Sequence, residues 1–180
     1  MFIQTEKTPN PNSLKFLPGK TVSNNGSFEV TRKEDTNNEL IKNILSINGV
    51  TGIFLGTDFL SINKNDETRW EDVKHIVISL INDFYSMGKE FIVEKELFEN
   101  KDNNQNEIEK KIINILETKI RPAVAKDGGD IKFREFKNGV VKVELQGSCS
   151  GCPSSTMTLK QGVENLLRHY LPEVKEVVAI

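Results

Sequence analysis

Cysteine is scarce in this sequence, and its two cysteines, Cys149 and Cys152, stand three positions apart. A small secreted protein held together by disulfides normally carries several cysteines spread along the chain. Two thiols in a C-x-x-C spacing indicate metal binding or redox chemistry instead. The sequence therefore argues against an extracellular disulfide framework.

Long apolar runs and a strong excess of one charge are also absent. No stretch approaches the ~18 apolar residues that suggest a membrane span, and the formal net charge is only -2. A charge so close to zero provides no basic field for a nucleic acid. We therefore expect no membrane and no nucleic acid among the partners. The first residues contain no charged segment followed by an apolar stretch, so we also expect no targeting peptide.

The composition that is present is typical of a globular protein, with 37% hydrophobic and 28% charged residues among 180. The pattern predicts an α+β fold made of two small α/β domains, residues 1–97 and 107–180. Between them, residues 98–106 are polar and show no periodicity, which is typical of a flexible linker.

The N-terminal domain is expected to alternate short strands with two helices. The expected elements are strands at 3–5 and 14–17, a helix at 39–47, a hairpin of strands at 50–55 and 59–63, and a helix at 71–85. The last helix has one apolar stripe at helical spacing, formed by Val73, Ile76, Val77, Leu80, Ile81 and Phe84.

The C-terminal domain is expected to follow the order α-β-β-α-β. The expected elements are a helix at 107–120, a turn at 127–130, strands at 131–136 and 140–146, a helix at 154–170 and a strand at 174–179. Asn138-Gly139 is the favoured residue pair for a two-residue hairpin turn between the two strands.

The two cysteines lie in the loop between a predicted strand and a predicted helix. Gly147 and Gly151 allow the backbone to turn tightly around a metal centre. Pro153 suits the first helical turn, where its missing N–H is no loss. The partial positive charge of the helix N-terminus favours the thiolate form, which binds metals and attacks disulfides.

Counting the available ligands limits what the loop can bind alone. A tetrahedral zinc site or an iron–sulfur cluster usually needs four protein ligands. His75 lies in the other domain, and His169 follows Cys152 by 17 residues on the same predicted helix. At ~1.5 Å per residue, His169 is on the order of 25 Å away. The simplest way to reach four ligands is a second chain, so that Cys149 and Cys152 are each supplied twice.

Two other uses of the same cysteines stay open at this point. A strand, a C-x-x-C and a helix also make up a thioredoxin-type site, so a thiol–disulfide oxidoreductase is the main alternative. No aromatic residue precedes Cys149, however, and the opening βαβ unit of that fold is absent. A zinc-linked dimer is a third possibility, and it predicts a colourless protein. Redox use predicts an active monomer with a reversible disulfide.

Three other residues near the cysteines have a structural and a functional interpretation. Asp127 and Asp130 are spaced like a pair of acid–base carboxylates, but Gly128-Gly129 between them favours a turn at the start of a strand. Met157 is a possible soft ligand, although methionine more often fills a core. We expect a structural role for all three.

Two stretches around the cysteines resemble the C-terminal domain of NifU and the Nfu proteins. They are residues 121–131 (RPAVAKDGGDI) and 145–160 (LQGSCSGCPSSTMTLK), and the closing residues 172–177 (PEVKEV) fit as well. The front of the chain is similar to the Nfu N-terminal domain at residues 8–16 (TPNPNSLKF), 49–54 (GVTGIF) and Trp70. The resemblance covers nearly the whole chain.

The resemblance implies a carrier or scaffold and not an enzyme. Members of this family bind [4Fe–4S] clusters on the C-x-x-C and pass them to apo-proteins, so Cys149 and Cys152 are the expected cluster ligands and metal ligands. Four thiolates also suit a [2Fe–2S] cluster. The expected partners are a second copy of the chain, client apo-proteins and the cluster-assembly machinery. Because eukaryotic members carry a targeting extension, the expected location is the bacterial cytoplasm.

Overall fold

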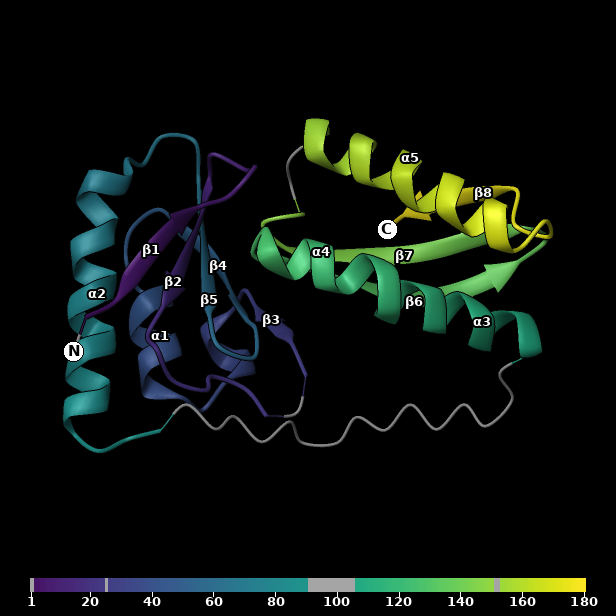
Figure 1. Ribbon diagram of the computed structural model, residues 1–180. Helices are drawn as coiled ribbons and strands as arrows, with labels where there is room; N and C mark the ends of the chain where they lie inside the picture. The colour runs from purple at the N-terminus through teal and green to yellow at the C-terminus, as the bar shows by residue number, and fades with distance from the viewer. Residues whose placement is uncertain (1, 25, 91–105, 151–152) are drawn as a thin grey trace.

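The computed structural model describes residues 2–24, 26–90, 106–150 and 153–180. These residues form two sheets, each with helices packed against it, so the predicted α+β fold is confirmed (Figure 1). We call residues 2–90 the N-terminal unit and residues 106–180 the C-terminal unit. Nearly all of the predicted linker, residues 98–106, lies outside the described residues.

The N-terminal unit is built on a five-stranded antiparallel sheet. In spatial order its strands are β1 (Gln4–Lys7), β2 (Ser13–Leu17), β5 (Leu60–Lys64), β4 (Val50–Leu55) and β3 (Phe28–Val30). The four strands expected from the sequence are confirmed. Strand β3 was not expected, because three residues are too short to show an alternating pattern.

Helices α1 (Glu39–Leu45) and α2 (Trp70–Ser86) cover one face of this sheet (Figure 1). Asn38 caps α1 by accepting hydrogen bonds from two backbone N–H groups of the first helical turn, which otherwise have no partner. A 3-10 turn, Lys33–Asp35, precedes it. The stripe predicted on α2 is narrower than expected: Val73 and Val77 are buried, but Ile76 is 47% exposed.

The C-terminal unit starts with a nearly continuous helical run. The run consists of α3 (Glu107–Ile115), a π turn at Leu116–Ile120 and α4 (Arg121–Lys126). Pro122 lies in the first turn of α4 and cannot donate a hydrogen bond back along the helix. The missing hydrogen bond explains why the helical hydrogen bonds change from α spacing to the wider π spacing just before Pro122.

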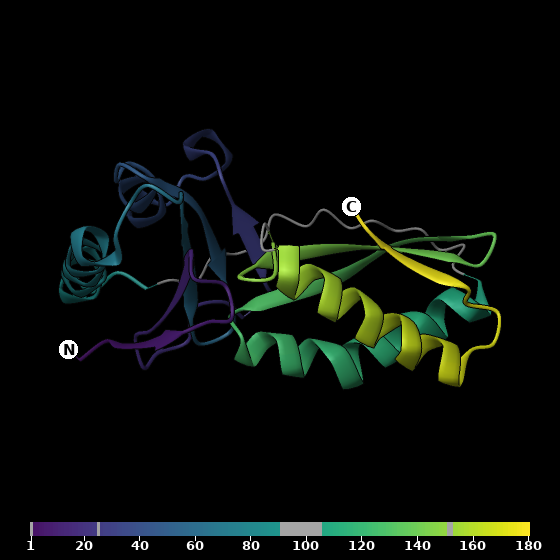
Figure 2. The same cartoon turned by 90° about the horizontal axis from the view of Figure 1, so that it is seen from above.

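Three strands and a last helix complete this unit. They are β6 (Gly129–Lys137), β7 (Val140–Gly147), α5 (Pro153–Tyr170) and β8 (Glu176–Ala179). Strand β8 pairs with β7 in parallel, and the helices lie on one face of the sheet (Figure 2). With α3 to α4 counted as one helical run, the predicted α-β-β-α-β order is confirmed.

The β6–β7 hairpin turns at the predicted dipeptide. Asn138 and Gly139 have φ angles of 53° and 78°, which is the left-handed backbone that a type I′ turn requires at both positions. The turn predicted at residues 127–130 is shorter than expected. Gly129 and Asp130 already belong to β6, because they pair with Gly147 and Gln146 of β7.

Within the described part of the chain, no helix is long and apolar enough to cross a membrane.

Candidate functional site

The loop that carries the cysteines leaves the end of β7 and leads into α5. Gly147 has a φ of 66°, and its carbonyl accepts hydrogen bonds from the N–H and the Oγ of Ser150, at 3.2 and 2.9 Å. A residue with a Cβ is strained in this left-handed conformation, which explains the glycine at the turn. Cys149 is described by the structure, whereas Gly151 and Cys152 lie outside the described residues.

Cys149 is 7% exposed and packs into the core of the C-terminal unit. It lies so close to β6 that a Cβ added to Gly129 would come within 2.5 Å of its Sγ. A cavity of about 230 Å³ adjoins it. The cavity is lined by Cys149, Pro9, Val124, Asp127, Ser148, Thr158 and Leu159. Pro9 belongs to the N-terminal unit, so both units contribute to the surroundings of the cysteine.

The N-terminal unit presents a polar sheet face to this loop. Leu14 and Phe16 of β2 point to the helices, so Lys15, which lies between them, points to the opposite face. Lys15 pairs across the strands with Ser61 of β5. Their side chains donate to the carbonyls of Lys126, at 3.4 Å, and Gly128, at 2.6 Å. The face opposite the helices is therefore an interface with the C-terminal unit.

Two asparagines extend these contacts to the cysteine loop itself. Asn10 is 6% exposed, and its Nδ2 donates to the carbonyls of Ser148 and Ser150, at 3.2 and 3.3 Å. The Nδ2 of Asn63 donates to the carbonyl of Gly147 at 3.1 Å. Buried polar groups are costly unless they are paired, so these bonds favour one specific docked arrangement. In this arrangement the carbonyls on both sides of Cys149 are held by the N-terminal unit.

Glu29 also contacts the cysteine loop, and it lies on β3, the edge strand opposite β1. Its Oε1 accepts a hydrogen bond from the Gly147 N–H at 3.2 Å. Burial raises the pKa of the Glu29 carboxyl above its ordinary value, and the bond from Gly147 offsets this only in part. The docked arrangement thus favours the neutral carboxyl.

We expect this glutamate to make stability depend on pH. Because its folded pKa is raised, its contribution is fully present below the ordinary pKa of a glutamate and is lost as the pH rises through the folded pKa. Glu29→Gln keeps an acceptor for Gly147 and cannot ionise. As the pH rises from the ordinary pKa of a glutamate through the raised folded pKa, the variant should therefore gain free energy of unfolding relative to the unchanged protein.

Urea unfolding at several pH values measures this difference. Glu67→Gln removes the same charge from an exposed position and serves as the control. Parallel stability curves for Glu29→Gln and the unchanged protein would show that Glu29 does not couple docking to pH.

The carboxylate of Asp130 is structural and not part of an acid–base pair. It is 4% exposed and forms a two-point ion pair with Arg121, at 2.8 and 3.0 Å. It also accepts hydrogen bonds from the Ile131 N–H and from Ser27 Oγ. Asp127 bonds to the cysteine loop through its backbone carbonyl, which accepts a hydrogen bond from Ser148 Oγ. The structural interpretation of both residues is supported.

Met157 and Trp70 differ in their exposure and packing. Met157 on α5 is 65% exposed, so the expectation that it fills the core is wrong. Trp70 packs partly against the N-terminal core, and its indole N–H donates to the Pro11 carbonyl at 2.9 Å.

Within the described residues, no three His, Cys, Asp or Glu side chains come together as a metal site.

Asn10, Glu29, Ser61 and Asn63 were not singled out from the sequence as site residues. The one available signal was on β5, where Ser61 and Asn63 alternate with the apolar Leu60 and Ile62. This alternation distinguishes a core face from a polar face. It gives no indication that the polar face docks on another part of the chain.

Known protein families match both parts of the chain. Residues 112–178 match the NifU-like domain, and residues 3–88 match the family described as scaffold protein Nfu/NifU N terminal. The chain is 44% identical, over 98% of its length, to NifU-like protein 4, mitochondrial, of Arabidopsis thaliana. It is 43% identical, again over 98%, to the NFU1 iron-sulfur cluster scaffold homolog, mitochondrial, of Drosophila ananassae.

The chain spans 65% of the length of the plant relative and 63% of the fly relative, just under two thirds of each. Among solved structures, the solution NMR structure of a NifU-like protein from Saccharomyces cerevisiae is similar to this chain. The matched region covers 53% of this chain and 87% of the yeast chain. The two are 29% identical, with a TM-score of 0.48.

The names of these relatives correct the expected location. Both curated relatives are named as mitochondrial proteins, so the expectation of a bacterial cytoplasmic protein is wrong. That expectation rested on the lack of a targeting segment in the sequence, which is not evidence of a location.

Proposed function

Since the chain belongs to the Nfu/NifU-like family of iron–sulfur cluster scaffolds, we propose that it carries an iron–sulfur cluster on Cys149 and Cys152 and transfers it to apo-proteins. The cluster is cargo, and the chain catalyses no reaction of its own. The fly relative is named as a cluster scaffold, which supports this role. The observation that carries the assignment of the site is the pair of cysteines, the only two in the chain, in one loop.

The cargo is a [4Fe–4S] cluster shared by two chains. One chain supplies two thiolates, and such a cluster is usually held by four. Two copies of the loop provide Cys149 and Cys152 twice and complete the set. The homodimer is thus a consequence of the ligand count. A cluster at such an interface can leave stepwise, as the thiolates of a client replace two ligands at a time.

In the docked arrangement Cys149 is 7% exposed, and the carbonyls on either side of it are bonded to Asn10. A cluster shared with a second chain and attack on a substrate disulfide both need an accessible Sγ. The proposal therefore includes release of the loop by the N-terminal unit before a second chain shares the cluster.

Anaerobic reconstitution of the full chain with iron and sulfide tests the proposal. We expect a brown protein whose coloured fraction elutes as a dimer, with about four iron and four sulfide per two chains. The measurements are visible absorption, metal and sulfide analysis, and light scattering on the eluting species. A colourless zinc-bound dimer, or a colourless monomer that reduces disulfides, would overturn the proposal.

A further inference from the structure

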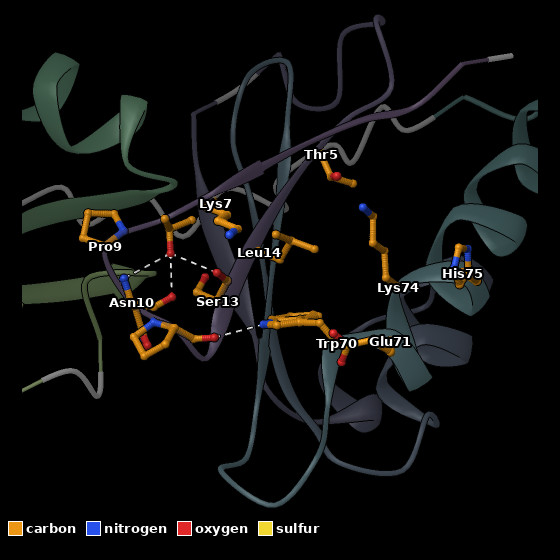
Figure 3. A pocket seen from close by; sticks show the side chains of 12 residues that line it. Thr5, Lys7, Pro9, Asn10, Ser13, Leu14, Trp70, Glu71, Lys74 and His75 are labelled. Carbon is orange, nitrogen blue, oxygen red and sulfur yellow. Dashed lines mark hydrogen bonds between the residues drawn. The ribbon is translucent and has the colours of Figure 1, made fainter.

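A groove of about 850 Å³ opens between the β1–β2 hairpin and the start of α2, on the N-terminal unit (Figure 3). It is lined by Thr5, Lys7, Thr8, Pro9, Asn10, Pro11, Ser13, Leu14, Trp70, Glu71, Lys74 and His75. We propose that this groove binds an extended, acidic segment of the client protein that receives the cluster. In naming the client as the occupant, the inference rests on the proposed function.

The position of β1 favours an extended occupant. β1 is the edge strand of its sheet, so one side of its backbone has no neighbouring strand among the described residues. An edge strand beside a helix is a recurrent site where an extended peptide adds to a sheet. Thr5 and Lys7 of β1 line one wall of the groove, and α2 lines the other. In Figure 3 the Lys74 side chain extends from α2 toward Thr5.

The charges on the groove favour an acidic occupant. Two lysines, Lys7 and Lys74, and a single carboxylate, Glu71, line the groove, although the whole chain has a net charge of -2. Among the residues that the structure describes, neither lysine has an ion-pair partner. When positive charge is concentrated at one place on a protein whose net charge is negative, that place favours negatively charged partners by electrostatic complementarity. An acidic segment would therefore be preferred over a neutral or basic one.

The apolar part of the groove is held in a fixed shape. The indole of Trp70 is anchored to the Pro11 carbonyl, and Lys64 lies over its ring at 5.6 Å from the centroid. Thr8 Oγ1 lies within hydrogen-bonding distance of the carbonyls of Asn10 and Ser13, at 2.8 and 2.9 Å, and it can donate to either, which stabilises the hairpin turn. A preformed surface loses little freedom when it binds a peptide.

The groove and Cys149 lie on opposite sides of the turn that contains Pro9 and Asn10. Pro9 lines both the groove and the cavity beside Cys149. Asn10, its neighbour, donates to the carbonyls of Ser148 and Ser150. A segment bound in the groove therefore touches the same turn that holds the cysteine loop. This places the client next to the loop of Cys149, one of the proposed cluster ligands.

The only tryptophan of the chain, Trp70, reports on the groove directly. The probe is a ten-residue peptide of alternating glutamate and valine, and the same peptide with lysine for glutamate is its control. Titrated into the full-length apo-protein at low salt, the acidic peptide should change the Trp70 fluorescence saturably, and the basic peptide should not. Hydrogen exchange at residues 4–7 should slow when the acidic peptide is bound.

Charge reversal tests the role of the two lysines. Lys7→Glu with Lys74→Glu should raise the dissociation constant of the acidic peptide by about tenfold or more. Lys33→Glu with Lys137→Glu makes the same change in net charge at exposed positions away from the groove and should leave the constant nearly unchanged. No saturable response, equal binding of both peptides, or unchanged exchange at residues 4–7 would overturn the proposal.

Cluster loading separates the two proposals. The Lys7→Glu, Lys74→Glu protein keeps both cysteines and should bind iron and sulfide like the unchanged protein, while cluster transfer to a client slows. If the chain never loads a cluster, the proposed function fails. If it loads one but the acidic peptide does not bind, only the groove proposal fails.

Discussion

Cys149→Ala should leave a protein that folds but retains almost no iron or sulfide after anaerobic reconstitution and gel filtration. The substitution halves the number of thiolates that two chains can offer, from four to two, and two ligands do not hold a cluster against exchange. The change in packing is small, because alanine is only slightly smaller than cysteine at this buried position. The loss of cargo should therefore far exceed the loss of stability.

The controls separate a lost ligand from a disturbed loop. Cys149→Ser keeps the size of the side chain but replaces the soft thiolate with a poor ligand for iron, so it should fail in the same way. Met157→Ala removes a thioether sulfur from α5, which follows the loop; this side chain is 65% exposed, and its loss should leave the iron content unchanged. Iron content near that of the unchanged protein in Cys149→Ala would show that the ligands lie elsewhere.

Local patterns in the sequence were sufficient to predict most of the secondary structure. The Asn138-Gly139 pair fixed a hairpin turn because few other residues adopt two successive left-handed conformations. The stripe on α2 placed Val77 and Ile81 correctly in the core. Ile76 was assigned to the same stripe and is exposed, because an apolar residue at the margin of a stripe can point either way.

Contacts between distant segments were not predictable in the same way. The composition suggested two domains joined by a flexible linker, and it gave no sign that Ser61 and Asn63 bond to carbonyls of the C-terminal unit. A polar side chain on a strand has the same pattern whether it faces water or another part of the chain. The two cysteines were identified because their spacing is itself a chemical signal. The packing around Cys149 has no such signal in the sequence.

That packing depends on a glycine, and Gly129→Ala should disturb both stability and cluster binding. A Cβ on Gly129 would lie 2.5 Å from Cys149 Sγ, 2.8 Å from the Gln146 carbonyl oxygen and 3.1 Å from the Cys149 N. Two of these three contacts are with backbone atoms, which cannot rotate away. Overpacking of this kind typically costs about 1–3 kcal/mol. The cysteine, as the movable neighbour, should be displaced from its position.

A second glycine in the same unit provides the matched control. Gly162 lies inside α5, where a Cβ would meet no atom within 4 Å, so Gly162→Ala should stabilise the protein by up to about 1 kcal/mol through helix propensity. Urea unfolding and iron content should be measured on the same preparations. The two alanine variants are then expected to change stability in opposite directions, and only Gly129→Ala should lose cluster. If Gly129→Ala is as stable as the unchanged protein and loads fully, β6 does not set the position of Cys149. If it is destabilised but loads fully, the cluster tolerates a displaced thiol, and the two chains must adjust their loops when they share it.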